Sequence, residues 1–294
     1  MNSEFLSNIR AIFGPDGEAW LANLPFIVEQ LRQLWDLPKI WPIEHLTYNY
    51  CCFAENKTGQ KFVIKIAPDE GVYTREVSAL QSFLGGVPKV VAVSAKHRAY
   101  LMERLSPGKD AKSIVQEGND DAATRIVARA IRQLKPKPGA SGFKHMIEFI
   151  PSLDMLRPHL DARSFEKLSA TFQSITTDRT NDVLLHGDLH HGNVLAHGDD
   201  WIAIDPHGYL GHPAAEVGAM IRNPWDAFPT DKPLRAIFDR RLNILKEELG
   251  YDLQMMNAWA YCITGLSEVW SLEDQGPSHR VDLEFLSALE DRVV

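Results

Sequence analysis

The hydrophobic pattern of this chain changes its period partway along, and that change constrains the fold more than any other feature. Between residues 45 and 103, short runs rich in aromatic and β-branched residues are typical of strands. The expected strands are residues 45–54, 61–67, 87–93 and 97–103. Because the polar stretch 55–59 separates the first two, they are predicted to form an antiparallel hairpin.

Helical periodicity accounts for most of the remaining sequence. Apolar residues recur at helical spacing over 18–36 and again over 72–84, where Leu84 closes the apolar stripe before two glycines. Beyond residue 108 the pattern is mostly helical. The exceptions are short apolar runs, expected to be small strands, at 183–185, 194–196 and 201–204.

This order predicts an α+β fold with two lobes. The length of 294 residues suits about two domains at roughly 150 residues each. The segment 104–108 contains Ser, Pro and Gly and is interpreted as the connector. We therefore expect an N-terminal lobe at 1–105, with a leading helix, and a C-terminal lobe at 106–294.

Charge and composition exclude several classes of function. Residues 1–180 carry 23 Lys and Arg against 20 Asp and Glu, whereas residues 181–294 carry 8 against 19. An acidic C-terminal third is the reverse of the basic surface that binds nucleic acid, and it favours a cationic partner. No run is long and apolar enough to span a membrane, and no secretory signal is apparent. Three cysteines, two of them adjacent, provide no disulfide framework, so a cytoplasmic location is expected.

The clearest chemical signal lies in two neighbouring segments. His186–Asn193 reads His-Gly-Asp-Leu-His-His-Gly-Asn, and Ile204–Gly208 reads Ile-Asp-Pro-His-Gly. Phosphoryl transfer needs a carboxylate that accepts a proton from an alcohol, together with oxygen ligands for Mg²⁺. Asp188, Asn193 and Asp205 have the residue types and spacing for those roles. Each alone is a common loop residue; the pattern is specific because short apolar runs flank it.

A lysine that contacts phosphate must then come from the first part of the chain. Lys65 lies in the middle of the apolar run 61–67, where an unpaired buried ammonium group would be costly. Glu76 borders the apolar stripe of the following helix and is its expected partner. The alternative is a lysine that reaches solvent beside a solvated glutamate. No glycine-rich phosphate loop is present; Thr47–Tyr50 stands where one would cover the phosphates.

A cluster of histidines opens a second interpretation. Six of the eleven histidines fall between 186 and 212, and Asp188-Leu-His190 is similar to the start of a binuclear phosphoesterase site. The further ligand segments of such a site are missing, and no Cys/His set with zinc spacing occurs. His186 is instead expected to be buried and to brace the loop by hydrogen bonds.

These motifs resemble the aminoglycoside phosphotransferase superfamily, small-molecule kinases with a protein-kinase-like fold. The resemblance is greatest to its streptomycin and hydroxyurea phosphotransferase branch. It is most specific over Val183–Leu195, Trp201–Gly208 and Gly211–Ala214, and weaker at Gly17–Trp20 and Leu101–Leu105. His207 and His212 depart from the branch's usual pattern.

The resemblance implies an ATP- and Mg²⁺-dependent kinase that phosphorylates a hydroxyl of a small cationic molecule, and so a role in antibiotic resistance. Asp188 would be the catalytic base, and Asn193 and Asp205 the Mg²⁺ ligands. Lys65, held by Glu76, would contact the phosphates. The remaining nucleotide contacts would come from the backbone at Glu103 and Leu105, which would bind adenine, and from the loop residues Tyr48, Asn49 and Tyr50.

The acceptor site is expected on the acidic C-terminal lobe, with Glu216, Asp226 and Glu268 as candidate carboxylates. The same machinery would also serve a kinase of a small metabolite such as a sugar, an amino alcohol or a glycated amine. A catalytically idle nucleotide-binding protein and a metallophosphoesterase are more remote alternatives. The sequence alone does not specify the acceptor or the oligomeric state.

Overall fold

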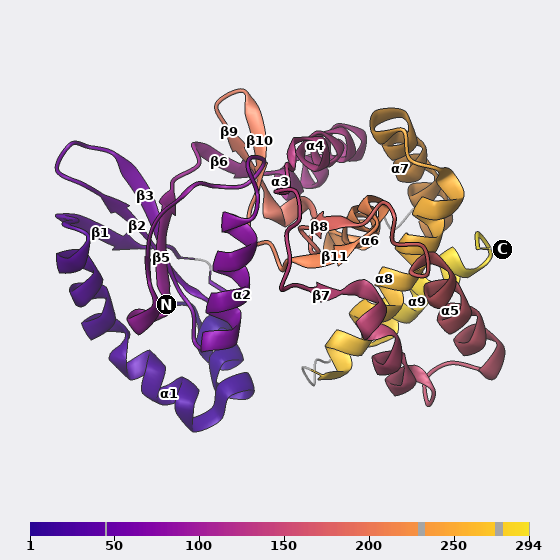
Figure 1. Ribbon diagram of the computed structural model, residues 1–294, viewed down its shortest axis with the longest axis horizontal. Coiled ribbons are helices and arrows are strands. Elements are labelled where there is room, and N and C mark those ends of the chain that lie inside the picture. Colours follow the sequence, from indigo (N-terminus) through magenta and orange to yellow (C-terminus); the bar gives the residue numbers. More distant parts are fainter. Residues whose placement is uncertain (45, 229–232, 274–278, 294) are drawn as a thin grey trace. The chain divides into compact units, whose positions relative to one another are not determined.

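The computed structural model describes residues 1–44, 46–228, 233–273 and 279–293. It divides into two compact units, one made of 1–81 and 88–105 and the other of 82–87 and 106–294. The first unit contains a sheet and two α-helices, and the second is mostly helical (Figure 1). The fold is therefore α+β, as the change of hydrophobic period predicts.

The first unit is built on a five-stranded antiparallel sheet in the order β1-β2-β3-β5-β4. Its strands are β1 (Lys39–Pro42), β2 (Tyr50–Glu55), β3 (Lys61–Ile66), β4 (Val90–Ser94) and β5 (Ala99–Glu103). The helices are α1 (Ser3–Leu34) and α2 (Glu70–Gln81), and a short 3-10 turn, η1 (Ala95–His97), joins β4 to β5. The predicted hairpin is confirmed as β2 and β3, with Cys51 opposite Lys65.

Helix α1 covers one face of this sheet (Figure 1). Its buried side chains, Leu24 and Leu31 among them, pack against Cys52, Ile64 and other inward-facing strand residues. The helix starts fifteen residues before the predicted position, at Ser3, and bends at Gly14, where a positive φ of 52° precedes Pro15. Glycine is the residue that tolerates this conformation, so the bend is local to it.

Two further expectations for the first unit are wrong in detail. Residues 46–49 form no strand, and residue 45 lies outside the described residues. Helix α2 ends at Gln81, and Leu84 is 67% exposed instead of closing the apolar stripe. The segment 82–87 packs with the second unit, where the Leu84 N–H donates to the Lys135 carbonyl. Strand β1 has no counterpart among the expected strands.

The second unit holds two small three-stranded sheets, β10-β9-β6 and β7-β11-β8. Their strands are β6 (Pro107–Asp110), β7 (Lys144–His145), β8 (Val183–Leu185), β9 (Val194–His197), β10 (Asp200–Ala203) and β11 (Tyr209–Gly211). The short runs at 183–185, 194–196 and 201–204 are thus strands within a residue or so of the expected limits. Strand β6 begins within the segment 104–108 interpreted as a connector and continues beyond it to Asp110.

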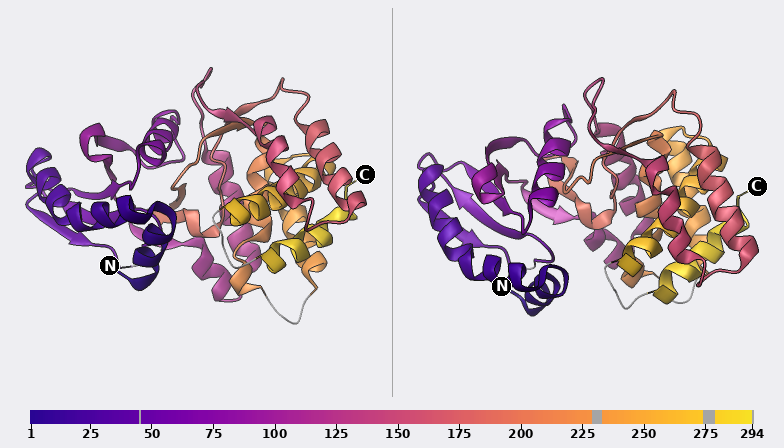
Figure 2. Two further views of the ribbon diagram at one scale, coloured as in Figure 1. Left: turned by 90° about the horizontal axis from the view of Figure 1, so that it is seen from below. Right: turned by 60° about the horizontal axis from the view of Figure 1, so that its bottom comes forward.

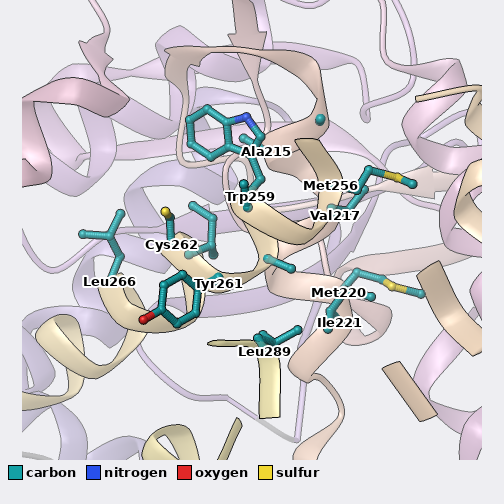
Figure 3. Packing of buried hydrophobic residues seen from close by; sticks show 14 of the residues in the cluster. Ala215, Val217, Met220, Ile221, Met256, Trp259, Tyr261, Cys262, Leu266 and Leu289 are labelled. Atoms are coloured by element: carbon teal, nitrogen blue, oxygen red, sulfur yellow. The ribbon is translucent and has the colours of Figure 1, made fainter. Parts of the chain in front are cut away.

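Helices form the rest of the second unit. The α-helices are α3 (Ala111–Gln116), α4 (Asp120–Gln133), α5 (Ala162–Ile175), α6 (Val217–Arg222), α7 (Leu234–Leu249), α8 (Leu253–Glu273) and α9 (His279–Glu290). The 3-10 segments are η2 (Met146–Leu156), η3 (His191–Asn193), η4 (Pro213–Glu216) and η5 (Trp225–Ala227). Helix α8 is buried along most of its length between α5, α6 and α9 (Figure 2). Figure 3 shows side chains of α6 and α8 meeting in this core, with Trp259 fully buried.

Candidate functional site

Two hairpin-like pairings bring the two chemical segments of the second unit together. Antiparallel pairing places Val194 of β9 opposite Ala203 of β10, so Asn193 and Ile204 follow at the same end. The β8–β11 pairing likewise places Leu185 opposite Tyr209. Both ends of each loop are therefore fixed by strands. Asn193 and Ile204, which about ten positions separate in the sequence, become neighbours for this reason.

His186 connects the two loops through its ring Nε2 and its carbonyl, and its ring Nδ1 braces its own loop. Its Nε2 lies 2.8 Å from the Ile204 carbonyl, and its Nδ1 lies 3.3 Å from the Asp188 N–H. Its own carbonyl accepts the N–H groups of His207 and Gly208 at 2.8 and 3.1 Å. The side chain is fully buried. The expectation of a buried histidine that braces the loop is confirmed.

The same contacts fix the protonation state of His186. Nε2 faces a carbonyl and must donate, whereas Nδ1 faces an N–H and must accept, so the ring is the neutral Nε2–H tautomer. Burial lowers the pKa of His186 to about 4, although Asp188 acts in the opposite direction. His186 thus serves as a neutral hydrogen-bonding strut at neutral pH.

Asp188 stands at the tip of this frame and is held by Asn193. The Asn193 amide donates to the Asp188 carbonyl at 2.9 Å and to its Oδ2 at 3.2 Å. His190 and His207 approach the same Oδ2 with Nε2 at 3.6 and 3.9 Å. The Asp188 side chain is 27% exposed. A carboxylate held this way can still reach a ligand while its rotamer is fixed, as proton acceptance from a bound hydroxyl requires.

The position of Asp205 is set by the hydrogen bond that closes the β9–β10 hairpin. The Ile204 N–H donates to the Asn193 carbonyl at 2.8 Å, and Asp205 is the residue that follows Ile204. Asp205 has a φ of 61°, a left-handed conformation that non-glycine residues seldom adopt. Because the Asn193 amide nitrogen is turned to Asp188, its Oδ1 is the oxygen left for another ligand. An amide oxygen and a carboxylate match the hard oxygen donors that Mg²⁺ prefers.

Glu216 has a different role from the one expected of it. The sequence placed it among the acceptor carboxylates, but it is 4% exposed and accepts the His186 N–H at 2.5 Å and the Gly187 N–H at 3.3 Å. Burial raises the pKa of its carboxyl to about 7, while those N–H groups lower it. Both oxygens are used inside the protein, so Glu216 anchors the start of the loop instead of facing an acceptor.

The other two proposed acceptor carboxylates are also engaged or enclosed. Asp226 lies in η5, and its Oδ2 pairs with the Lys112 ammonium at 2.8 Å. Glu268 is 1% exposed in the buried part of α8. Glu268 is therefore enclosed, whereas the Asp226 side chain is 42% exposed but already paired with a lysine. Across the described ranges, no group of three or more His, Cys, Asp and Glu side chains is placed to hold a metal ion.

In the first unit, the Lys65 ammonium and the Glu76 carboxylate form the expected ion pair. The Nζ–Oε1 distance is 2.5 Å, and the two side chains are 4% and 8% exposed. Strand β3 holds the lysine in the sheet, and α2 carries the glutamate on its buried face. Removing one partner would leave a buried charge without its counter-ion, which typically costs about 3–5 kcal/mol.

The proposed phosphate loop divides into two environments. Tyr48 is 48% exposed, and the buried Oδ1 of Asn49 has no hydrogen-bond partner among the residues that the structure describes. Tyr50 instead belongs to β2, and its ring lies 6.4 Å from that of Phe5 in α1. Tyr50 is thus packed against the leading helix and is not part of a loop.

The segment expected to bind adenine ends strand β5. The Glu103 N–H donates to the Lys89 carbonyl, and its carboxylate accepts the Lys89 N–H at 2.8 Å. Because the Glu103 N–H is already used, the Glu103 backbone could bind a base only by accepting a hydrogen bond at its carbonyl oxygen. Leu105 is buried, at 7% exposure, at the end of the first unit.

Comparison with known proteins shows similarity to antibiotic resistance kinases, in agreement with the motifs. Residues 51–275 match the family described as aminoglycoside/hydroxyurea antibiotic resistance kinase. Streptomycin 6-kinase from Streptomyces glaucescens is 26% identical over 272 residues, covering 89% of this chain and 87% of that protein. Streptomycin 3''-kinase from Klebsiella pneumoniae is 34% identical over 196 residues, covering 64% of this chain and 71% of that protein.

Solved structures show the same fold at low identity. A choline/ethanolamine kinase family protein from Mesorhizobium loti aligns with a TM-score of 0.65 and 12% identity, covering 90% of this chain and 94% of that one. The fold is thus the protein-kinase-like fold that the sequence motifs suggest. Within the described part of the chain, no helix has both the length and the apolar character to cross a bilayer.

Proposed function

Since the chain belongs to the aminoglycoside/hydroxyurea antibiotic resistance kinase family, we propose that it transfers the terminal phosphate of ATP to a hydroxyl of a cationic aminoglycoside such as streptomycin. Hydroxyurea-like molecules are the other acceptors that the family description suggests. The observation that carries this proposal is the double contact of the Asn193 amide with the carbonyl and carboxylate of Asp188. It fixes a reactive carboxylate beside an oxygen donor.

Asp188 acts as the base in this reaction. Its carboxylate accepts the proton of the acceptor hydroxyl as the new bond forms between that oxygen and the terminal phosphorus. The bond from this phosphorus to the bridging oxygen of ATP breaks, and ADP leaves. His186 and Glu216 take no proton in this scheme; they hold the backbone on either side of Gly187 in place.

The nucleotide contacts are assigned to the first unit. Lys65 contacts the phosphates and is oriented by Glu76. Tyr48 and Asn49 are the residues assigned to the loop over the phosphates, because they lie between β1 and β2 outside either strand. The backbone at Glu103 and Leu105 binds adenine. In this scheme residues 1–105 serve the nucleotide and 106–294 the acceptor.

Asn193 and Asp205 would hold Mg²⁺. The metal ion, when bound, neutralises phosphate charge and so favours attack by the acceptor oxygen. The chain contributes the two oxygen donors and, through the Ile204–Asn193 hydrogen bond, their closeness in the hairpin. We place the reaction in the cytoplasm, where ATP is abundant and where the free thiols Cys51, Cys52 and Cys262 stay reduced.

The test measures ADP release with a panel of acceptors: streptomycin, hydroxyurea, a sugar and an amino alcohol. We expect turnover with streptomycin, and a fall of about 10²–10⁴ in kcat for Asp188→Asn with ATP binding retained. Asp199→Asn is the matched control, because Asp199 lies exposed in the nearby β9–β10 turn. Wild-type turnover in Asp188→Asn would reject the assigned base. Preference for the sugar or the amino alcohol would make the protein a metabolite kinase.

A further inference from the structure

A line of aromatic rings leads away from Asp188 within the second unit. The His207 and Tyr209 rings meet edge to face, with centroids 6.0 Å apart. Tyr209 stacks with Trp270 at 6.5 Å and an interplanar angle of 18°. Phe149 of η2 meets both of these rings edge to face, at 5.1 and 5.8 Å. Residues from the loop before β11, from β11, from α8 and from η2 thus form one cluster.

This cluster is tied to the reactive carboxylate. His207 Nε2 lies 3.9 Å from Asp188 Oδ2. Gly187, next to Asp188, packs so closely on Tyr209 that a Cβ there would lie 2.5 Å from the tyrosine ring. Gly187 also has a φ of 85°, so a larger residue would be excluded by conformation and by space. The position of the rings relative to Asp188 is therefore set by direct contact.

The two ends of the line are accessible, whereas its middle is buried. The His207 side chain is 42% exposed and Trp270 is partly exposed, while Tyr209 and Phe149 are 8% and 7% exposed. The buried rings hold the outer ones by edge-to-face contacts. Trp270 is thus an aromatic surface that is already fixed in orientation before any ligand arrives.

Rings of this kind attract cations through their electron-rich faces, tryptophan most strongly. One ring of the cluster already does so, because the Lys144 Nζ lies 3.8 Å from the centroid of Phe149. The segment 181–294, with 8 basic against 19 acidic residues, adds a field that favours positive ligands. Open carboxylates were expected to bind the acceptor, but Glu216 and Asp226 are already engaged.

We propose that Trp270, supported by Tyr209 and reached past His207, forms the subsite that binds a planar guanidinium group of the acceptor. This inference rests on the proposed kinase function, since it concerns the acceptor of that reaction. In this arrangement cation recognition is mainly aromatic, and the flat guanidinium group lies against the indole. Trp270 then determines which acceptor is bound, and Asp188 determines which of its atoms reacts.

The first experiment measures streptomycin binding by calorimetry in the Asp188→Asn protein, which isolates binding from turnover. Streptomycin is a suitable probe because its streptidine ring carries guanidinium groups. Trp270→Leu should raise Kd about 5- to 30-fold, and Trp270→Phe should raise it less because a ring remains. Trp225→Leu is the matched control, as Trp225 is 53% exposed in η5, outside the cluster. Equal Kd values for Trp270→Leu and Trp225→Leu would overturn the proposal.

A second experiment uses the wild-type protein, so it does not depend on a variant folding. Agmatine, a guanidinium compound, should displace streptomycin, whereas carbamoylputrescine, which keeps the ammonium group of agmatine but has a neutral urea in place of the guanidinium group, should not. Equal displacement by both, or by neither, would overturn the proposal. The two hypotheses fail separately. Absence of turnover with normal streptomycin binding rejects the kinase function but leaves the subsite; turnover with unchanged KM in Trp270→Leu rejects the subsite alone.

Discussion

Replacing Glu216 by glutamine should change how the stability of the second unit depends on pH. The Glu216 carboxyl is buried and has a pKa near 7, against an ordinary value of 4.5. A folded-state pKa above the unfolded one means that the folded protein binds this proton more readily. The stabilising contribution is therefore fully present below about pH 4.5 and is lost as the pH rises through 7.

The size of this effect follows from the shift. Each pKa unit corresponds to about 1.4 kcal/mol, so the contribution of Glu216 should fall by about 2.5 kcal/mol between pH 5 and pH 8. His186 acts in the opposite sense. Its folded pKa of about 4 lies below the usual 6.5, so its contribution is present above 6.5 and is lost as the pH falls towards 4. These two buried neighbours largely cancel in the wild-type protein.

Glu216→Gln removes only one of the two opposing contributions. We expect the free energy of unfolding, measured by urea denaturation, to rise more steeply from pH 5 to pH 8 in the variant than in the wild type. The difference between the two proteins should change by about 2.5 kcal/mol over this range. Glu247→Gln is the control, since Glu247 is 68% exposed on α7. A wild-type-minus-variant difference constant to within about 0.5 kcal/mol would refute the reasoning.

Three other substitutions test separate parts of the molecule. Lys65→Ala should raise the KM for ATP and lower kcat, as seen in steady-state kinetics, and unchanged values of both would remove the lysine from the nucleotide site. Asn193→Ala should lower kcat by about 10²-fold and raise the Mg²⁺ concentration needed for half-maximal rate, because it releases Asp188 and removes an oxygen donor; an unaltered Mg²⁺ titration would contradict the metal assignment. Arg241→Met should cost about 3–5 kcal/mol in chemical denaturation, because the buried guanidinium binds Asp120 and three carbonyls. The neighbouring exposed pair gives the comparison: Arg240→Ala should cost under about 1 kcal/mol.

The fold class and the local elements near the motifs follow from the sequence because they depend on short-range periodicity. Hairpin β2–β3 and strands β8, β9 and β10 are short apolar runs bounded by polar or glycine-containing turns. Features that depend on distant partners were not predictable. Strand β1 is defined by its pairing with β2, and Leu84 does not continue the buried stripe of α2 because its segment belongs to the second unit.

The candidate site divides in the same way. Sequence by itself determined which residues carry the chemistry, since Asp188, Asn193 and Asp205 lie in short motifs whose residue types and spacing suit phosphoryl transfer. Only the tertiary structure decided that Glu216, thirty residues beyond His186, anchors the loop. It also decided that the Trp270 ring stacks on the Tyr209 ring. The physical reason is that a motif records what one short stretch of chain can do, whereas burial, pairing and ring contacts depend on the segments that folding brings against it.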